Sequence, residues 1–350
     1  MAKSYFRENV DEMSPYVPGE QPADGERVVK LNTNENPYPA SPRVAEAVNE
    51  VMVDARLYPD PVATGLRAAA AEAWGFEPAQ IIAGNGSDEL LAMLIRAVVP
   101  PGEKVAYPVP TYSLYRTLVK GHGAESVTVQ WPDDYTLPMK ELASSGARLV
   151  FVARPNAPTG TVVALDALAA LARGLDGVVC VDEAYADFAE DNAFGLVREF
   201  GNVIVLRTLS KSFSLAGARV GLGFAQEPLI DGLNKIKDSY NLSRMALAAG
   251  EAAVRDLEWM KANVAKVRRT RTRLVGELGR LGVSCTASHA NFVFASIGPK
   301  ARNVYEALKA RGILVRYFDE DRVRHGLRIT VGTDEEVDEL LKALAEILPA

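Results

Sequence analysis

The sequence predicts an α/β protein with a mostly parallel central sheet covered by helices, followed by a smaller α+β domain. Short apolar runs alternate with amphipathic helical patterns between residues 80 and 210, and these runs are apolar on both faces. The pattern changes after about Ala246, where a long charged stretch begins. Because 48% of the 350 residues are hydrophobic, the chain can fill a sizeable core.

The opening of the chain, residues 14–42, is rich in proline and asparagine and is expected to run extended over the surface. We assign residues 1–45 to an N-terminal arm. The first residues lack the apolar core of a signal peptide, and no stretch has the roughly eighteen uninterrupted apolar residues of a membrane span. These features indicate a cytoplasmic protein with no membrane partner.

Six apolar runs have the length and composition of strands in a covered sheet. They lie at residues 80–84, 104–108, 126–130, 148–153, 177–183 and 202–207. Amphipathic stretches between them, such as 88–99 and 164–174, predict helices. The resulting β-α-β-α order predicts a large α/β domain over residues 46–245.

The remaining residues, 246–350, predict the smaller α+β domain. A long charged helix is expected at 255–281, and a terminal helix is expected from Asp334. Short strands are expected between them at 291–296, 312–316 and 326–331.

Composition excludes several classes of function. The net charge of -6 argues against nucleic-acid binding, which needs concentrated lysine and arginine. The two cysteines, Cys180 and Cys285, are both expected to be buried and make no disulfide framework. The three histidines, His122, His289 and His325, have no metal-ligand spacing, so no metal site is predicted.

Three predicted strands run directly into polar motifs, at residues 154–160, 182–185 and 208–213. In open α/β sheets, ligands bind where the loops leave the carboxyl ends of the strands. Lys211 lies in the third motif, before an apolar, glycine-containing stretch that should desolvate its amine and make it a better nucleophile. A lone lysine of this kind would normally be a solvated surface residue. Here, other motifs at the ends of the neighbouring strands favour a role in a binding site.

Asp182 ends a strand so apolar that an unpaired carboxylate there would be costly. It is suited to keep the pyridine nitrogen of pyridoxal 5'-phosphate (PLP) protonated, with Lys211 as the Schiff-base lysine and Tyr185 beside the ring oxygen. A helix N-cap is the alternative role for Asp182. We therefore predict catalytic roles for Lys211, Asp182 and Tyr185.

Residues 84–89 follow a strand and open a helix, which would offer free backbone N–H groups to the cofactor phosphate. Arg219, with the hydroxyls of Ser210 and Thr208, can add charge and further donors. Neither a Walker A loop nor the GxGxxG dinucleotide fingerprint is present. Nucleotide binding and an NAD-dependent oxidoreductase are therefore disfavoured.

Taken together, the motifs resemble those of fold-type-I PLP aminotransferases, and most closely the histidinol-phosphate aminotransferase family. The resemblance rests on residues 15–19 (PYVPG), 34–38 (NENPY), 58–60 (YPD), 86–89 (GSDE), 110–112 (PTY), 182–185 (DEAY), 210–211 (SK), Arg219 and 327–332 (LRITVG). It covers almost the whole chain. It implies transamination of L-histidinol phosphate with 2-oxoglutarate, which gives imidazole acetol phosphate and L-glutamate in histidine biosynthesis.

The resemblance also implies roles for individual residues. Lys211 would anchor the cofactor and move the proton, and Tyr58 would reach the cofactor phosphate of a neighbouring subunit in a homodimer. The implied cofactor-binding residues are Ser87, Asp88, Tyr112, Asn156, Asp182, Tyr185, Ser210, Lys211, Arg219 and Tyr58. The implied substrate-binding residues are Arg328, Arg316, Tyr16 and Asn34.

One loop departs from the family pattern Asn-Pro-Asn-Asn-Pro-Thr-Gly. Arg154 stands at its first position, and Ala157 replaces the fourth residue, whose side chain usually reaches the cofactor oxygen. Either Tyr185 or Asn156 could supply the missing hydrogen bond. Three alternatives share these motifs or the cofactor: an aromatic amino-acid aminotransferase, a threonine-phosphate decarboxylase and a non-catalytic PLP-binding module.

Overall fold

The computed structural model describes residues 4–23, 25 and 27–348. A seven-stranded sheet forms the centre of the larger part, in the order β2-β8-β7-β6-β5-β3-β4. Its strands are β2 (Ile81–Asn85), β3 (Lys104–Val109), β4 (Glu125–Gln130), β5 (Leu149–Ala153), β6 (Val178–Asp182), β7 (Val203–Thr208) and β8 (Val220–Ala225). β8 is antiparallel to both of its neighbours, and the other strand pairs are parallel. The predicted fold class and all six predicted strands are confirmed.

Helices cover both faces of this sheet because its strands are apolar on both sides. In β5, Leu149 and Phe151 belong to one buried cluster, whereas Val150 and Val152 belong to the other. The first cluster includes side chains of α4 (Ser87–Val98), α5 (Leu114–His122) and α9 (Glu227–Asn234). The second includes α3 (Thr64–Trp74), α7 (Leu165–Gly174), α8 (Phe194–Glu199) and α10 (Arg244–Val254).

The strand β8 was not predicted, because its two glycines, Gly221 and Gly223, interrupt the apolar pattern. Packing requires the first of them. A Cβ atom on Gly221 would lie 2.4 Å from the backbone nitrogen of Ser87. The glycine therefore allows β8 to approach the first turn of α4, which is a feature of the site described below.

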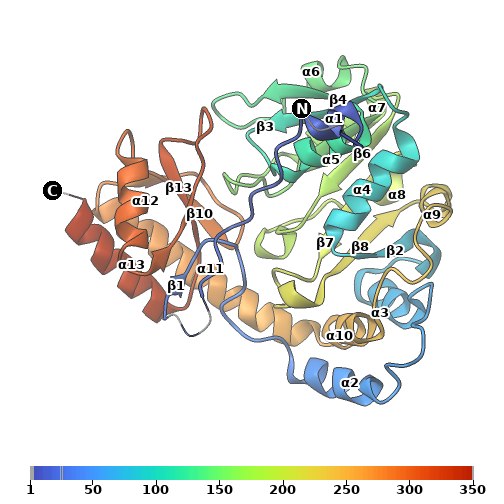
Figure 1. Ribbon diagram of the computed structural model, residues 1–350, viewed down its shortest axis with the longest axis horizontal. Helices are drawn as coiled ribbons and strands as arrows, with labels where there is room; N and C mark the ends of the chain where they lie inside the picture. The colour runs from blue at the N-terminus through green and yellow to red at the C-terminus, as the bar shows by residue number, and fades with distance from the viewer. Residues whose placement is uncertain (1–3, 24, 26, 349–350) are drawn as a thin grey trace.

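The second sheet has the order β12-β13-β10-β9 and lies beside the larger part (Figure 1). Its strands are β9 (Ser284–Cys285), β10 (Phe292–Ser296), β12 (Arg316–Tyr317) and β13 (Gly326–Thr330). The helices of this part are α11 (Leu257–Arg280), α12 (Ala301–Lys309) and α13 (Asp334–Ile347). The predicted long helix and terminal helix are confirmed. The boundary predicted at residue 246 falls inside α10, which packs on α3 and α2 (Pro42–Met52), and the division into domains stays a prediction.

The arm does not lie on the surface along its whole length. The segment β1 (Val29–Lys30) pairs in parallel with β11 (Ile313–Leu314), and Leu31 and Asn34 are each 1% exposed. In Figure 1 this segment runs between the two parts of the molecule. The prediction that this segment lies on the surface is therefore wrong for these residues, since they pack between the larger part and the part that contains the second sheet.

Two smaller predictions also need correction. The strand expected at residues 312–316 is divided between β11, which pairs with the arm, and β12, which belongs to the second sheet. Cys180 is buried as expected, but Cys285 is partly exposed at the sheet edge. Among the described residues there is no helix that could cross a membrane and no acidic, histidine and cysteine cluster suited to a metal.

Candidate active site

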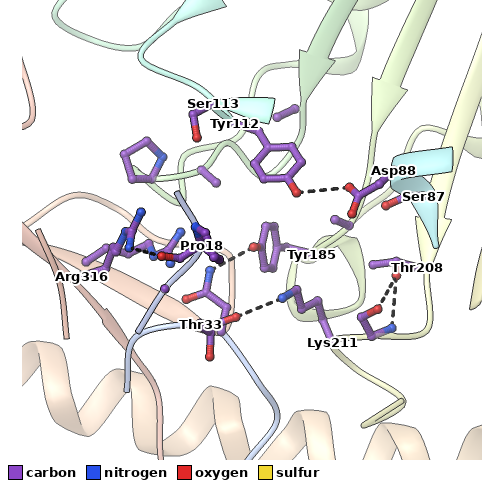
Figure 2. Close-up of a pocket in the computed structure, with 18 of the residues that line it drawn as sticks. Pro18, Thr33, Ser87, Asp88, Tyr112, Ser113, Tyr185, Thr208, Lys211 and Arg316 are labelled. Carbon is purple, nitrogen blue, oxygen red and sulfur yellow. Dashed lines mark hydrogen bonds between the residues drawn. The ribbon is translucent and has the colours of Figure 1, made fainter. Parts of the chain in front are cut away.

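A pocket opens where β5, β6 and β7 end and α4 begins (Figure 2). Because β5, β6 and β7 are parallel, Ala153, Asp182 and Thr208 at their carboxyl ends lie along the same edge of the sheet. The arm and the second sheet complete the wall with Tyr16, Arg316 and other residues. The site thus combines the arm, the larger part and the second sheet. The order of the strands predicted only the contribution of the large sheet.

Lys211 lies in the turn after β7 and extends into the pocket (Figure 2). Its Nζ donates a hydrogen bond of 3.1 Å to the backbone oxygen of Thr33 and lies 5.8 Å from the centre of the Tyr185 ring. Burial, together with the nearby charge of Arg328, lowers the pKa of Lys211 to about 8. A larger fraction of this amine than of a free lysine is therefore neutral near physiological pH, which favours a role as nucleophile or base.

Asp182, at the end of β6, is 5% exposed. Burial raises the pKa of its carboxyl to about 6, opposed by the hydroxyl of Tyr115, which donates to Oδ2 at 2.7 Å. The backbone N–H of Ala184 donates to Oδ1 at 3.2 Å. The carboxylate is therefore held in a fixed orientation and is charged at neutral pH.

Tyr115 is a residue that the sequence reasoning missed. It is fully buried and stacks on Phe151, with ring centres 4.8 Å apart. Its ring contacts that of Tyr112 edge to face, with ring centres 5.6 Å apart. The spacing of the two residues gave no signal, because Tyr112 precedes α5 and does not share a helix face with Tyr115. We propose that it fixes the carboxylate of Asp182.

An anion cradle lies at the first turn of α4. Gly86 precedes this helix, whose first residues, Ser87 and Asp88, line the pocket at the positive end of the helix dipole. Gly86 has a φ of 76°, which favours glycine, and a Cβ atom there would lie 2.6 Å from Nη2 of Arg219, so the guanidinium would have to move away. Arg219 also contacts Ser210, whose Oγ accepts from Nη1 at 3.3 Å and from Thr208 at 3.0 Å.

Asp88 and Tyr112 lie beside this cradle (Figure 2). Asp88 forms a 3.1 Å ion pair with Arg219, and its other oxygen accepts from the Tyr112 hydroxyl, also at 3.1 Å. Burial raises the pKa of Tyr112, so its hydroxyl stays protonated as a donor. These contacts hold the ring of Tyr112 at the wall of the pocket, where it can cover a flat ligand.

The opposite wall carries two arginines from the second sheet. Arg328 donates from Nη2 to the backbone oxygen of Asn32 at 2.8 Å, but its buried Nε has no partner among the described residues. Arg316 donates to the backbone oxygens of Val17 and Pro18 at 2.8 and 3.0 Å. Burial lowers the pKa of Arg328, although it still carries its charge at neutral pH. The unpaired donor favours an anionic ligand at this end.

Two of the predicted cofactor-binding residues do not face the pocket. Asn156 is 1% exposed, and its side chain is fully used by Pro110, Thr111 and Thr159. Tyr58 is 76% exposed on the outer surface, where it stacks on Tyr240 with ring centres 4.5 Å apart. Within one chain, neither of them reaches the pocket.

Arg154 belongs to a buried group of charges behind the site. It pairs with Asp191 at 2.6 Å and with Glu183 at 3.5 Å, and Arg207 pairs with the second oxygen of Glu183 at 3.3 Å. Arg207 also contacts Asp187. The ion pairs join the ends of β5, β6 and β7, which explains why an arginine can replace the usual asparagine in this loop.

These groups fit PLP by the chemistry of the donors they offer. Lys211 supplies an amine of lowered pKa, Asp182 supplies a carboxylate for a ring nitrogen, and the cradle around Arg219 supplies donors for a phosphate. The two glycines let the parts of this cradle come together, since a Cβ atom on Gly86 would meet the Arg219 guanidinium and one on Gly221 would meet the backbone of Gly86 and Ser87. The fold and the site together define a PLP-dependent enzyme of fold type I.

Comparison with known proteins narrows this class. The family described as aminotransferase class I and II matches residues 26–344. Histidinol-phosphate aminotransferase 1 of Trichormus variabilis is 45% identical over 347 residues, which cover 99% of both chains. Histidinol-phosphate aminotransferase of Geobacter sp. is 46% identical over 348 residues, covering 98% of this chain and 99% of the relative.

A solved structure agrees with these relatives. The crystal structure of histidinol-phosphate aminotransferase from Sinorhizobium meliloti, in complex with PLP, superposes with a TM-score of 0.92 at 29% identity, covering 99% of this chain and 98% of that one. The chain belongs to the aminotransferase class I and II family. The predicted family and cofactor are confirmed.

Proposed function

We propose that the chain transfers the amino group of L-histidinol phosphate to 2-oxoglutarate, giving imidazole acetol phosphate and L-glutamate in histidine biosynthesis. The observation that carries this proposal is the pair of arginines, Arg316 and Arg328, facing a pocket that also holds Lys211. The cradle around Arg219 serves the cofactor phosphate, so the arginine pair is left for a second anion. Histidinol phosphate offers a phosphate there, and glutamate offers a carboxylate.

The chemistry divides between the cofactor and the chain. Bound PLP supplies an electron sink for the charge that develops at the substrate α-carbon. We propose that Lys211 Nζ accepts the proton that leaves this carbon, and that Asp182 places a negative charge at the ring nitrogen. Arg328 and Arg316 orient the substrate through its anionic group, while Tyr112 and Tyr16 exclude water from the face of the pocket.

The decisive experiment compares amino donors in the first half-reaction. PLP-loaded protein is mixed with L-histidinol phosphate, with phenylalanine or with glutamate, and loss of the visible cofactor band is followed. Rapid loss with histidinol phosphate and slow loss with phenylalanine supports the proposal. Preference for phenylalanine would indicate an aromatic amino-acid aminotransferase. Release of carbon dioxide from threonine phosphate would indicate a threonine-phosphate decarboxylase. Absence of turnover with every donor would indicate a non-catalytic PLP-binding module.

Arg328→Met is expected to raise the KM of both histidinol phosphate and glutamate by about 100-fold, because a charged bidentate contact contributes about 2–3 kcal/mol. Arg328→Lys should lie between this variant and the native protein, since it keeps the charge but loses the fork geometry. Steady-state kinetics measure both. Arg302→Met on α12 is the control, and an unchanged KM in Arg328→Met would remove this residue from substrate binding.

The rate at which PLP attaches covalently to the apoprotein is expected to rise with pH and to level off near the Lys211 pKa of about 8. Only the neutral amine attacks the aldehyde carbon, and burial makes deprotonation easier than in free lysine. Stopped-flow absorbance over a pH series measures this rate. A rate that keeps rising toward the ordinary lysine pKa of 10.5 would contradict the desolvated site.

We further propose a homodimer in which Tyr58 completes the neighbouring site. The segment around Tyr58 exposes several large apolar side chains, which suits coverage by a second copy. These are Met52, Val53, Leu57 and Val62, with Tyr240 stacked on Tyr58. The expected cytoplasmic location also stays a prediction.

Mixed dimers test this arrangement. When one subunit carries both Lys211→Ala and Tyr58→Phe, the native partner's site receives the altered residue, and its PLP affinity should fall about tenfold through loss of one charged hydrogen bond. When the two changes lie on different subunits, the functional site keeps a native Tyr58, and its affinity should be unchanged. Equal affinities in the two arrangements would exclude a cross-subunit contact.

A further inference from the structure

Asn34 connects the arm to both other parts of the molecule at the wall of the pocket. It is 1% exposed and adopts a left-handed backbone conformation with φ of 57°, which asparagine tolerates better than most residues. Its side chain contacts Tyr185, which follows β6, and Thr330, which ends β13. The backbone oxygen of Asn34 accepts from Asn291 at 2.9 Å, so its position is fixed on several sides.

The direction of each hydrogen bond follows from the donors available. The backbone N–H of Asn34 donates to Thr330 Oγ1 at 3.0 Å. This hydroxyl therefore uses its own hydrogen for Asn34 Oδ1, also at 3.0 Å. With its oxygen turned toward Thr330, the amide presents Nδ2 to the hydroxyl of Tyr185 at 2.9 Å.

An amide nitrogen can only donate, so the Tyr185 hydroxyl must accept this bond. A hydroxyl carries one hydrogen, and no hydrogen bond among the described residues uses the hydrogen of Tyr185. The hydrogen is therefore free to point into the pocket, on the side where Lys211 lies. Because Asn34, Thr330 and Asn291 are each 2% exposed or less, water does not compete for these contacts.

We propose that Asn34 and Thr330 are positioning residues that fix the Tyr185 hydroxyl as a hydrogen-bond donor to the ring oxygen of PLP. This inference rests on the role proposed for Tyr185 at that oxygen. It gives Asn34 a role beside the substrate contact that the sequence predicts, because Oδ1 and one N–H of its amide are used by Thr330 and Tyr185. It also provides the donor that Ala157 cannot supply.

Thr330→Val and Thr330→Ser form the matched pair that tests the proposal. Valine keeps the shape but removes the hydroxyl that orients the amide, and serine keeps the hydroxyl. Thr330 does not line the pocket, so an effect on PLP must pass through its neighbours. We expect Thr330→Val to weaken PLP binding to the apoprotein about five- to tenfold and to shift the visible band of the loaded enzyme, while Thr330→Ser stays within about twofold of the native affinity.

A double-mutant cycle separates this role from a general loss of structure. In a Tyr185→Phe background there is no hydroxyl to orient, so Thr330→Val should have no further effect on PLP affinity. Asn34→Asp gives a second route if the valine variant folds poorly. Its carboxylate cannot donate, so the Tyr185 hydroxyl would turn toward it, and PLP binding should weaken at least as much as in Tyr185→Phe.

Fluorescence titration of the apoprotein measures each affinity. The proposal fails if Thr330→Val binds PLP as the native protein does, or if its penalty is the same with and without the Tyr185 hydroxyl. If Tyr185→Phe itself leaves affinity and spectrum unchanged, the role of Tyr185 at the ring oxygen is wrong, and the assignment of the reaction is unaffected because it rests on the donor comparison.

Discussion

Lys211→Ala is expected to abolish covalent attachment of PLP and to lower turnover by at least about 10³-fold. The variant loses both the nucleophile that anchors the cofactor and the base that accepts the α-proton, and a positioned base alone contributes about 10²- to 10⁴-fold. Borohydride reduction followed by mass spectrometry of the intact chain measures attachment, and the donor half-reaction measures turnover. The fold should remain intact, since alanine fits where the lysine projects into an open pocket.

Lys261→Ala on the surface of α11 is the control, because this lysine is exposed and pairs with Glu258 across one turn of the helix, away from the pocket. It should retain attachment and turnover. Attachment that persists in Lys211→Ala would place the anchoring amine elsewhere, whereas lost attachment with native turnover would refute the role of Lys211 as the base.

The sheet could be predicted because its strands are apolar on both faces and end in polar motifs. Leu149 and Phe151 contact one helical layer while Val150 and Val152 contact the other, so each strand reads as a continuous apolar run. Strand β8 lacks this signal because Gly221 serves a close approach to α4, which only the folded structure reveals.

In the site, motifs that follow parallel strands were easier to place than contacts between distant segments. Asp182 and Lys211 line the same pocket because β6 and β7 are neighbours that end at one edge of the sheet. The contact between Asn34 and Thr330 joins residues 296 positions apart, and no local pattern encodes it. For Asn156, the motif predicted the loop correctly but not the direction of the side chain. The side chain donates to the backbone oxygen of Pro110 instead of facing the pocket.

Burial shifts the pKa values of Asp182 and Lys211 in opposite directions. It raises the pKa of Asp182 to about 6 and lowers that of Lys211 to about 8. Between these values, most of Asp182 is ionised, and Lys211 releases its proton at a lower pH than a free lysine does. Removing one charge should therefore impair one function and leave the other in place.

Asp182→Asn tests this separation. The amide has the same shape but cannot hold a positive charge at the ring nitrogen, and loss of one partner of a buried pair costs about 3–5 kcal/mol, or roughly 10²- to 10⁴-fold in rate. We expect kcat to fall by this factor while PLP stays attached to Lys211. Tyr115→Phe keeps the carboxylate and should lose far less, and Asp231→Asn on α9 should lose nothing.

The pH dependence of PLP affinity gives an independent measure of the same charge. Because burial raises the pKa of Asp182 to about 6, its carboxylate forms as the pH rises through that value, and PLP affinity of the native apoprotein should rise with it. The part of this rise that comes from the carboxyl group should disappear in Asp182→Asn, while the part that comes from the cofactor's own phosphate, whose second pKa is about 6, should remain. Glu183, whose pKa burial raises to about 7, pairs with Arg207 behind the site and should not replace it. A native kcat in Asp182→Asn, or a rise in affinity as large as that of the native protein, would show that another group holds the ring nitrogen.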